Sequence, residues 1–208
     1  MTMARSGKNT AHLIREKATE LFFLKGYAGT SLREVAAASG LQIGSLYNHI
    51  SSKEDLLLQV MGGVIDDLVA EQETAMATPG DAVDKLRAAV DCHVRFHAQH
   101  APEVHIGNSN LAALSDGARE EIVRKRKDYE RNIQSLVEEA GRAGLASVLD
   151  ARLHTFSILG MGTHLAGWYR PEGRLSLDEI ADTYTTLALR ELKVIDADER
   201  VEQAAQAG

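Results

Sequence analysis

Residues 31–53 read SLREVAAASGLQIGSLYNHISSK and contain side chains whose types and spacing suit contact with a nucleic acid. Two short runs with apolar residues at helical spacing, Leu32 to Ser39 and Ile43 to Ile50, lie on either side of Gly40. Neither run is long enough to be a stable helix by itself. Two helices joined by a turn of three to four residues that contains glycine form the helix-turn-helix pattern. The stretch therefore predicts a helix-turn-helix.

The second run has one apolar face and one polar face. Leu41, Leu46 and Ile50 are spaced to pack against neighbouring helices. On the other face, a glutamine amide such as that of Gln42 can pair with adenine, and a hydroxyl such as that of Ser45 can bond most base edges. A further set of side chains has the reach or the helix-terminal position to contact phosphate oxygens. This set is Thr30, Ser31, Tyr47, His49 and Lys53.

The composition predicts an all-α protein. Ala, Leu, Glu and Arg are frequent and favour helices, and only three prolines occur among 208 residues. No run alternates apolar and polar residues over the length of a strand. The helices are expected at about 10–26, 31–40, 43–50, 52–76, 82–100, 116–142, 150–169 and 176–192, with a turn-like segment at 106–110. Three of them have expected N-caps, namely Thr30 or Ser31, Ser52 and Ser176, and Glu34, Asp55 and Glu179 stand at capping-box distance from the three serines.

Charge is distributed unevenly along the chain. The formal net charge is −7, but residues 1–60 carry seven basic and five acidic side chains, so the acidic excess lies in the remainder. A single cysteine, Cys92, excludes an intrachain disulfide framework and fits a reducing compartment. The first residues contain no apolar core and no apolar run reaches membrane-spanning length, so we expect neither a signal peptide nor a membrane-spanning helix. We expect a cytoplasmic protein with no membrane association.

The N-terminal quarter of the chain resembles the DNA-binding region of TetR-family transcriptional repressors. The residues that carry the resemblance are Gly26, Tyr27, Thr30, Ser31, Arg33, Val35, Ala36, Ser39, Gly40, Leu41, Gly44, Ser45, Leu46, Tyr47, His49, Ile50, Ser52, Lys53, Glu54 and Leu56. Two positions depart from the family pattern, which usually has Ser or Thr at Gln42 and Phe at Ile50. Gln42 is a weaker helix cap and is free to point at bases, while Ile50 keeps an apolar anchor.

The resemblance implies a DNA-binding domain followed by a domain that dimerises and binds a small inducer. The predicted organisation is an arm at 1–9, a three-helix DNA-binding domain at 10–56, a ligand-binding and dimerisation domain at 57–195 and a polar tail at 196–208. The implied partner is a near-palindromic double-stranded operator, bound by a homodimer. The predicted DNA contacts are Thr30, Ser31, Arg33, Gln42, Ile43, Gly44, Ser45, Tyr47, Asn48, His49 and Lys53.

The last two long helices are the predicted dimer surface. The helix at 150–169 carries several small residues, and mid-helix glycines cost about 1 kcal/mol each relative to alanine. The close approach of another helix would offset that cost, although these glycines could also merely weaken a buried helix. The residues concerned are Ser157, Gly160, Gly162, Thr163 and Gly167, with Thr183, Thr186, Leu187 and Leu189 on the last helix.

Polar and aromatic residues on apolar stripes of the body suggest a ligand pocket, for which core packing is the competing interpretation. They are Phe96, His97, Arg126, Tyr129, Phe156, His164 and Trp168. The stretches HVRFH and WYRPEGRLSLDEIA also look like a TetR subgroup that controls lipid or steroid breakdown and answers to acyl-CoA thioesters. We therefore expect an acyl-CoA or another lipid-like metabolite as inducer.

Two alternatives stay open at this point. A DNA-binding regulator without an inducer would need no cavity in its body. A metal-dependent enzyme would use His93 and His97, but a metal site needs a third ligand, and the residues between them do not form an HExxH motif. The chain also shows no nucleophile–base pair, carboxylate pair or phosphate loop. The expectation is a protein that is not an enzyme and has no metal or cofactor.

Overall fold

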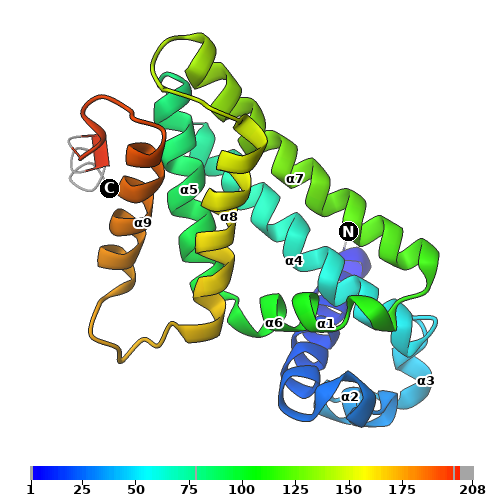
Figure 1. Cartoon of the computed structure of the whole chain (residues 1–208). Coiled ribbons are helices and arrows are strands. Elements are labelled where there is room, and N and C mark those ends of the chain that lie inside the picture. The colour runs from blue at the N-terminus through cyan, green and yellow to red at the C-terminus, as the bar shows by residue number, and fades with distance from the viewer. Residues whose placement is uncertain (1, 78, 199, 202–208) are drawn as a thin grey trace. The chain divides into compact units, whose positions relative to one another are not determined.

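The computed structural model describes residues 2–77, 79–198, 200 and 201, and side chains from residue 9 onward (Figure 1). Every regular element within these ranges is helical, which confirms the all-α prediction. The elements are α1 (Thr2–Gly29), α2 (Leu32–Ala38), α3 (Ile43–Leu46), α4 (Lys53–Met76), α5 (Ala82–Gln99), α6 (Ala101–Ser109), η1 (Leu111–Ala113), α7 (Asp116–Arg142), α8 (Ala151–Trp168) and α9 (Leu177–Glu191).

The chain divides into two compact units. The first, which we call the head, consists of residues 1–65 and 102–124, and the second, the body, consists of residues 66–101 and 125–208. The helices α4 and α7 each contribute residues to both units. The predicted domain boundary lay at residue 56, with residues 57–195 as one domain. The structure instead groups 102–124 with the head, which a reading along the chain could not anticipate.

The head is held together by one apolar core. Residues from α6, from η1 and its C-cap, and from the start of α7 join those of the first four helices, because a three-helix unit alone has too few apolar side chains to enclose a core. The buried members are Ile14, Ala18, Phe22, Val35, Ala36, Leu46, Ile50, Leu56, Leu57, Val60, Met61, Ile106, Leu114 and Ile122. This core fixes the positions of α2 and α3.

Helix boundaries in the head follow from glycine and capping residues. Gly26 has φ 76° and interrupts the helical geometry of α1, and Gly40 has φ 68° in the turn between α2 and α3. Such positive φ values are readily adopted only by glycine. Ser31 caps α2 in the capping box predicted with Glu34. The Ser52 hydroxyl accepts a hydrogen bond from the Asp55 amide at the start of α4, as its predicted capping role requires.

Three local expectations differ from the structure. The helix α1 begins at Thr2 rather than near residue 10, so it includes residues 2–9 of the predicted arm. The helix α3 ends at Leu46 and not near Ile50, and residues 47–49 form turns. The segment 106–110 is not a turn, because α6 extends from Ala101 to Ser109. Pro102 lies in the first turn of α6, where a missing N–H costs nothing.

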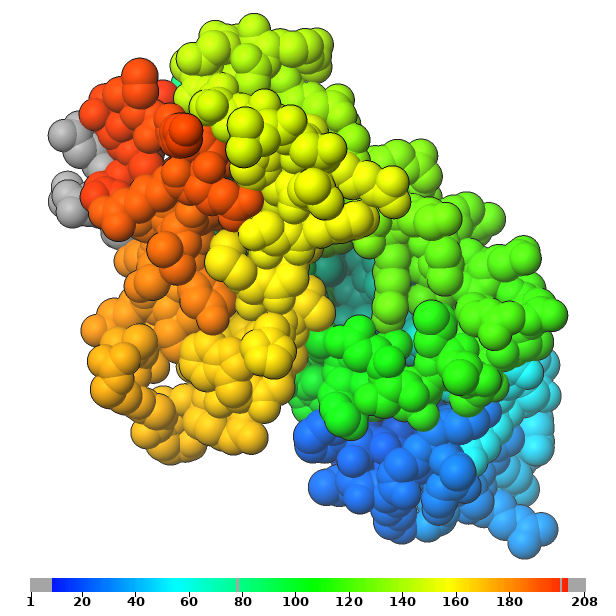
Figure 2. All heavy atoms as spheres, viewed as in Figure 1, coloured from blue at the N-terminus to red at the C-terminus, as the bar shows by residue number. Residues whose placement is uncertain are grey.

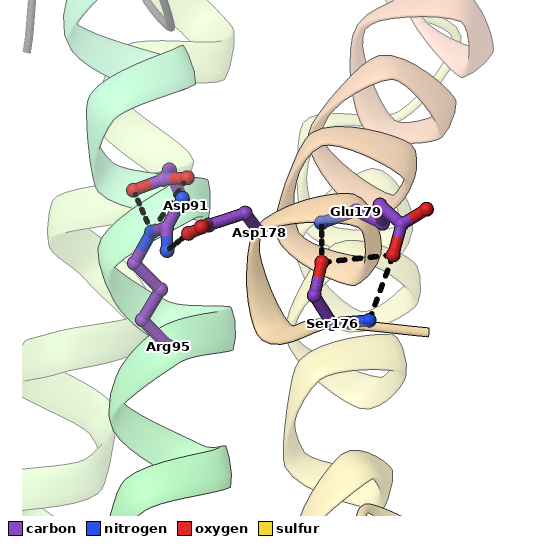
Figure 3. A network of polar contacts seen from close by, with 5 residues as sticks. All are labelled: Asp91, Arg95, Ser176, Asp178 and Glu179. Atoms are coloured by element: carbon purple, nitrogen blue, oxygen red, sulfur yellow. Dashed lines mark hydrogen bonds and ion pairs between the residues drawn. The ribbon is translucent and has the colours of Figure 1, made fainter. Parts of the chain in front are cut away.

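The body is organised around α5, which packs against both α8 and α9 (Figure 1). Arg95 of α5 donates from Nε to both carboxylate oxygens of Asp91, at 3.1 and 2.9 Å, and pairs through a terminal nitrogen with Asp178 of α9 (Figure 3). Figure 3 also shows the capping box in which Ser176 and Glu179 begin α9. These contacts fix the start of α9 against α5.

The described part of the predicted polar tail is docked on the body. The Arg200 guanidinium donates to the Asp84 carboxylate at 2.8 Å and to Asp81 at 3.2 Å. Ala197 and Val201 are buried. The tail thus adds charge-assisted contacts to the N-terminus of α5, where Asp81 is the cap.

Gly162 of α8 lies against the buried ring of His93 in α5. A Cβ at this position would lie 2.2 Å from His93 Cδ2 and 2.7 Å from Nε2, which is closer than atoms can approach. A Cβ built on Gly160, two residues earlier, would have no described atom of a neighbouring element within 4 Å. The close approach that offsets the cost of the Gly162 glycine is therefore made by a helix of the same chain.

Replacing Gly162 by alanine should therefore destabilise the body, while the same change at the exposed Gly117 of α7, where a Cβ would have no described atom within 4 Å, should not destabilise the protein. We expect Gly162→Ala to lower the free energy of unfolding by about 1–3 kcal/mol through overpacking against His93. Gly117→Ala should raise that free energy by up to about 1 kcal/mol, because alanine is the better helix former. Urea denaturation of the two variants checks this, and equal effects at both positions would contradict it.

Candidate nucleic-acid interface and ligand site

The short helix α3 is buried on one side and exposed on the other. Leu46 is fully buried and Ile50 is 3% exposed, whereas Tyr47 is 54% exposed. Burial of Leu46 and Ile50 in the head core orients the helix, as their spacing predicted. The exposed side presents Gln42, Ile43, Gly44, Ser45, Tyr47 and Asn48. These predicted contact residues thus share one continuous surface, joined by the half-buried His49.

The N-terminus of α3 is open to solvent. Gln42 is the N-cap residue, yet its side chain makes no capping hydrogen bond to any residue that the structure describes. The Gln42 amide is therefore available for other contacts, as its weak capping ability predicted. No described atom lies within 4 Å of a Cβ built on Gly44, so no side chain covers the backbone of α3 at this position. This combination permits close approach of a large partner.

Lys53 does not extend freely from the head. Its ammonium donates to the Ala28 carbonyl at 3.3 Å and lies 4.4 Å from the centre of the Tyr27 ring. A cation in this position is attracted to the face of the ring. Lys53 therefore joins the start of α4 to the end of α1, while its remaining N–H groups can still reach an anion.

Thr30, which was predicted as a DNA contact at a helix N-terminus, lies inside the head. Its side chain is buried, and its hydroxyl lies 3.0 Å from the Gly26 carbonyl and 3.1 Å from the Leu21 carbonyl, both of which can accept its proton. The hydroxyl is thus used to close the end of α1 after its kink. Thr30 supports the interface from within.

The N-terminus of α2, predicted as an anion site, already holds a carboxylate. Glu34 accepts from the Ser31 amide at 2.7 Å and from the Ser31 hydroxyl at 2.8 Å, and it pairs with Lys25 at 2.7 Å. Lys25 and these Ser31 hydrogen bonds lower the pKa of Glu34 to about 2. A phosphate here would have to compete with Glu34, whereas Arg33 remains exposed beside it.

The body contains a chain of buried neutral polar groups from α5, α7 and α8. His93 Nε2 lies 3.0 Å from the Leu159 carbonyl, which can only accept, so Nε2 carries the ring proton. Nδ1 therefore accepts from the Tyr129 hydroxyl at 2.7 Å. Burial, with the nearby His97, holds the pKa of His93 well below its usual range, and burial raises the pKa of Tyr129 well above its own. Both groups are neutral near pH 7.

His97 continues this arrangement one turn along α5. Its Nδ1 donates to the His93 carbonyl at 2.8 Å, and its ring lies 4.0 Å from the His93 ring. Burial lowers the pKa of His97 to about 4. Because both nitrogens of His93 are already engaged, the pair cannot ligate a metal as it stands, and no group of three metal-ligating side chains occurs among the described residues.

Gln72 of α4 completes the cluster and was not among the predicted residues. Its side chain is fully buried. Its hydrogen bond with the Tyr129 hydroxyl lowers the pKa of that group, against the larger effect of burial, which raises it. A signal existed in the sequence, because Gln72 follows Ile65 and Leu68 at helical spacing on a buried stripe.

Only some of the predicted ligand residues lie with this cluster. Phe96, His97 and Tyr129 are buried, and Arg126 is half-buried one turn before Tyr129, where burial lowers its pKa. Three others lie on the outer face of α8, namely Phe156 (44% exposed), His164 (exposed) and Trp168 (45% exposed). Figure 2 shows α8, in yellow, at the surface of the body.

The described helices include none that is long and apolar enough to cross a membrane.

Family models match both parts of the chain: residues 14–60 match bacterial regulatory proteins of the tetR family, and residues 79–192 match the tetracyclin repressor-like C-terminal domain. The HTH-type transcriptional repressor KstR2 of Rhodococcus jostii (strain RHA1) is 27% identical over 197 residues, which are 90% of this chain and 92% of that protein.

Two solved structures are similar over most of the chain. A regulatory protein of the tetR family from Rhodococcus RHA1 has a TM-score of 0.82 and 27% identity, covering 90% of this chain and 98% of that one. AibR in complex with isovaleryl coenzyme A and operator DNA has a TM-score of 0.77 and 30% identity, covering 86% of this chain and 97% of that one.

Neutral buried histidines make stability depend on pH. The pKa of His97 is about 4 in the folded protein against an ordinary value of 6.5, so the unfolded chain binds a proton that the folded one does not. The resulting stabilisation is complete above pH 6.5 and is lost as pH falls toward 4. The free energy of unfolding should drop by about 2 kcal/mol from pH 7 to pH 5 for His97 alone.

Urea denaturation at the two pH values measures this drop. His97→Gln should reduce the drop, whereas His12→Gln, at an exposed position of α1, should leave it unchanged. Equal stability of the native protein at pH 7 and pH 5 would contradict a neutral, buried His97.

Proposed function

The chain belongs to the TetR family of bacterial regulatory proteins, and from this membership we propose that it represses transcription by binding a near-palindromic operator as a homodimer and is released by a lipid-like metabolite of the acyl-CoA class. Members of this family are DNA-binding transcriptional regulators and not enzymes. Because its proposed partner is operator DNA, the proposed location is the cytoplasm.

The observation that carries the DNA-binding proposal is the exposed side of α3. Gln42, Ser45 and Asn48 present amide and hydroxyl groups that match the hydrogen-bonding edges of bases in the major groove. Tyr47 and Lys53 flank this set with groups that suit phosphate oxygens. Thr30 drops out of the proposed contacts because its hydroxyl is buried, and Ser31 contributes only if Glu34 gives way.

Apolar residues on the outer surface of α8 and α9 support dimerisation through these two helices. Leu153 is 66% exposed, Phe156 44% and Leu187 44%. Gly160, His164 and Gly167 lie exposed on the same helix α8. A second copy of the chain packed on this surface would remove these apolar groups from water and form a four-helix bundle about a two-fold axis.

The buried polar cluster of the body supports an inducer site. The helices α4, α5, α7 and α8 converge on Gln72, His93 and Tyr129. AibR, a similar protein, was solved with isovaleryl coenzyme A and operator DNA. An inducer would favour a conformation with altered operator affinity by no more than its difference in affinity for the two conformations.

Alanine at Gln42 or Asn48 should weaken operator binding without unfolding the head, because both side chains are exposed. Loss of a base contact corresponds to roughly a tenfold or larger reduction in affinity. Gel-shift titration on fragments selected from genomic DNA measures this. Asn132→Ala, at an exposed position of α7 in the body, is the matched control. Unchanged operator affinity in both variants would contradict the proposal that the exposed side of α3 contacts DNA.

A charge on the outer face of α8 should separate the dimer. Leu153→Glu would place a carboxylate in the proposed apolar contact, so we expect the dimer dissociation constant to rise by at least about tenfold. Sedimentation analysis follows the change. Leu24→Glu, at a position of α1 that is 76% exposed, should leave the association unchanged. A native protein that sediments as a monomer refutes this proposal.

A further inference from the structure

The ring of Tyr27 contacts Lys53, one of the side chains proposed to bind phosphate. The Lys53 ammonium lies 4.4 Å from the centre of the ring and donates to the Ala28 carbonyl at 3.3 Å. A cation over the face of an aromatic ring is attracted by the negative charge density of that face. The last turn of α1 contains no basic residue of its own, so Lys53 also supplies the positive charge that a helix C-terminus favours.

The Tyr27 ring is itself fixed by the core of the head. Tyr27 packs against this core, and its ring meets the buried ring of Phe22 edge to face, with 5.3 Å between the centroids and 73° between the planes. Directly before it, Gly26 interrupts α1 with a φ of 76° that only glycine adopts readily. A ring held in this way restricts where the flexible side chain of Lys53 ends.

The charge of Lys53 is available to a partner outside the chain. Lys25, near the same end of α1, pairs with Glu34, whereas Lys53 forms no ion pair with any acidic side chain that the structure describes. An ammonium has three N–H donors, and within the described residues only the one directed at Ala28 has a partner. The other donors and the positive charge can therefore meet a phosphate oxygen.

A lysine that is held in place before DNA arrives binds phosphate more tightly. A flexible side chain loses rotamer freedom when it forms a contact, which weakens binding by about two- to tenfold for each side chain that is immobilised. The Tyr27 ring and the Ala28 carbonyl already restrict the ammonium in the DNA-free protein. In a homodimer the contact occurs twice, so the effect on affinity is multiplied.

We propose that Tyr27 is a positioning residue for DNA binding, whose ring holds the Lys53 ammonium where it contacts a phosphate of the operator. The proposal rests on the proposed function, because it concerns the same DNA contact. It assigns the contribution of Tyr27 to the aromatic ring and not to the hydroxyl, so Tyr27 itself needs no hydrogen bond to DNA.

Exchanges at Tyr27 test the role of the ring. The full chain is titrated in gel shifts with a fragment selected from genomic DNA and, in parallel, with a duplex of unrelated sequence. Tyr27→Phe keeps the ring and should bind with native affinity, whereas Tyr27→Leu should bind at least about fourfold more weakly, which is about twofold for each chain of the dimer. The loss should be equal on both duplexes, because phosphate contacts carry no sequence information. Phe23→Leu, at an exposed position of α1, is the matched control.

Fluorination separates the electrostatic role of the ring from its shape. Tyr27→Phe is prepared with one, two or three fluorines on the ring, which change its volume little but withdraw charge from its face and so weaken its attraction for a cation. We expect affinity for both duplexes to fall in steps along this series, an effect that a purely structural ring would not produce. In a Lys53→Met background, which keeps the side-chain stem without the charge, the steps should vanish.

The inference and the proposed function fail in different ways. Weaker binding along the fluorinated series that depends on Lys53 supports the inference, and this series decides the question if Tyr27→Leu does not fold. The inference alone is overturned if the native protein binds the selected fragment and the series shows no trend, or a trend that persists in Lys53→Met. Weaker binding by Tyr27→Phe, native affinity in a folded Tyr27→Leu, or a larger loss on the selected fragment than on the unrelated duplex also overturns it. A native protein that binds neither duplex refutes the proposed function and the inference together.

Discussion

Burial of Leu46 and Ile50 is the constraint on which the proposed DNA-contacting side of α3 depends. The helix α3 has four residues and could not persist in water by itself, because so short a helix cannot offset its nucleation cost. Its geometry is imposed by these two side chains in the core of the head and by the left-handed turn at Gly40. These contacts therefore determine the orientation of the exposed side chains from Gln42 to Asn48.

The head core in turn needs residues that come later in the chain. Ile106, Leu114 and Ile122 complete it, and the Glu54 carboxylate at the start of α4 accepts from the Ser115 amide just before α7 at 2.8 Å. A small unit of three helices buries more apolar surface when residues 102–124 pack against it. A cut at the end of the helix-turn-helix would therefore remove part of the core that positions α3.

In the body, close packing and neutral polar contacts occur together. The ring of His93 fits against α8 only because Gly162 has no side chain, and this approach brings Nε2 to the Leu159 carbonyl. That hydrogen bond fixes the tautomer, which in turn makes Nδ1 the acceptor for Tyr129. The fully buried Gln72 extends this chain of contacts to α4 through its hydrogen bond with Tyr129.

Sequence reasoning predicted the elements with strong local signals. The helical class, the capping boxes and the exposed face of α3 followed from spacing and from residue type, which act over a few residues. The burial of Thr30 could not be predicted, because a threonine after a glycine turn can point inward or outward. The position of Glu34 against Ser31 was predicted as a cap, but its consequence for phosphate binding became clear only from Lys25 and the distances.

Contacts between residues far apart in the chain could not be predicted from local sequence patterns. Gly162 was noted as a costly glycine, but its partner lies on α5, about 70 residues earlier in the chain. Phe156, His164 and Trp168 are spaced along α8 as a pocket wall would be, yet they lie on its outer face. Their spacing fixed their common side of the helix but not whether that side faces the core or the solvent.

The central claim is that α3 enters the major groove twice, once from each chain of a symmetric pair. Footprinting of the purified protein on a fragment selected from genomic DNA tests it most directly. The account predicts two protected half-sites of related, inverted sequence whose centres lie about 34–36 Å apart, or a multiple of this, along one face of the duplex. A single protected half-site, or uniform protection without sequence symmetry, would contradict it.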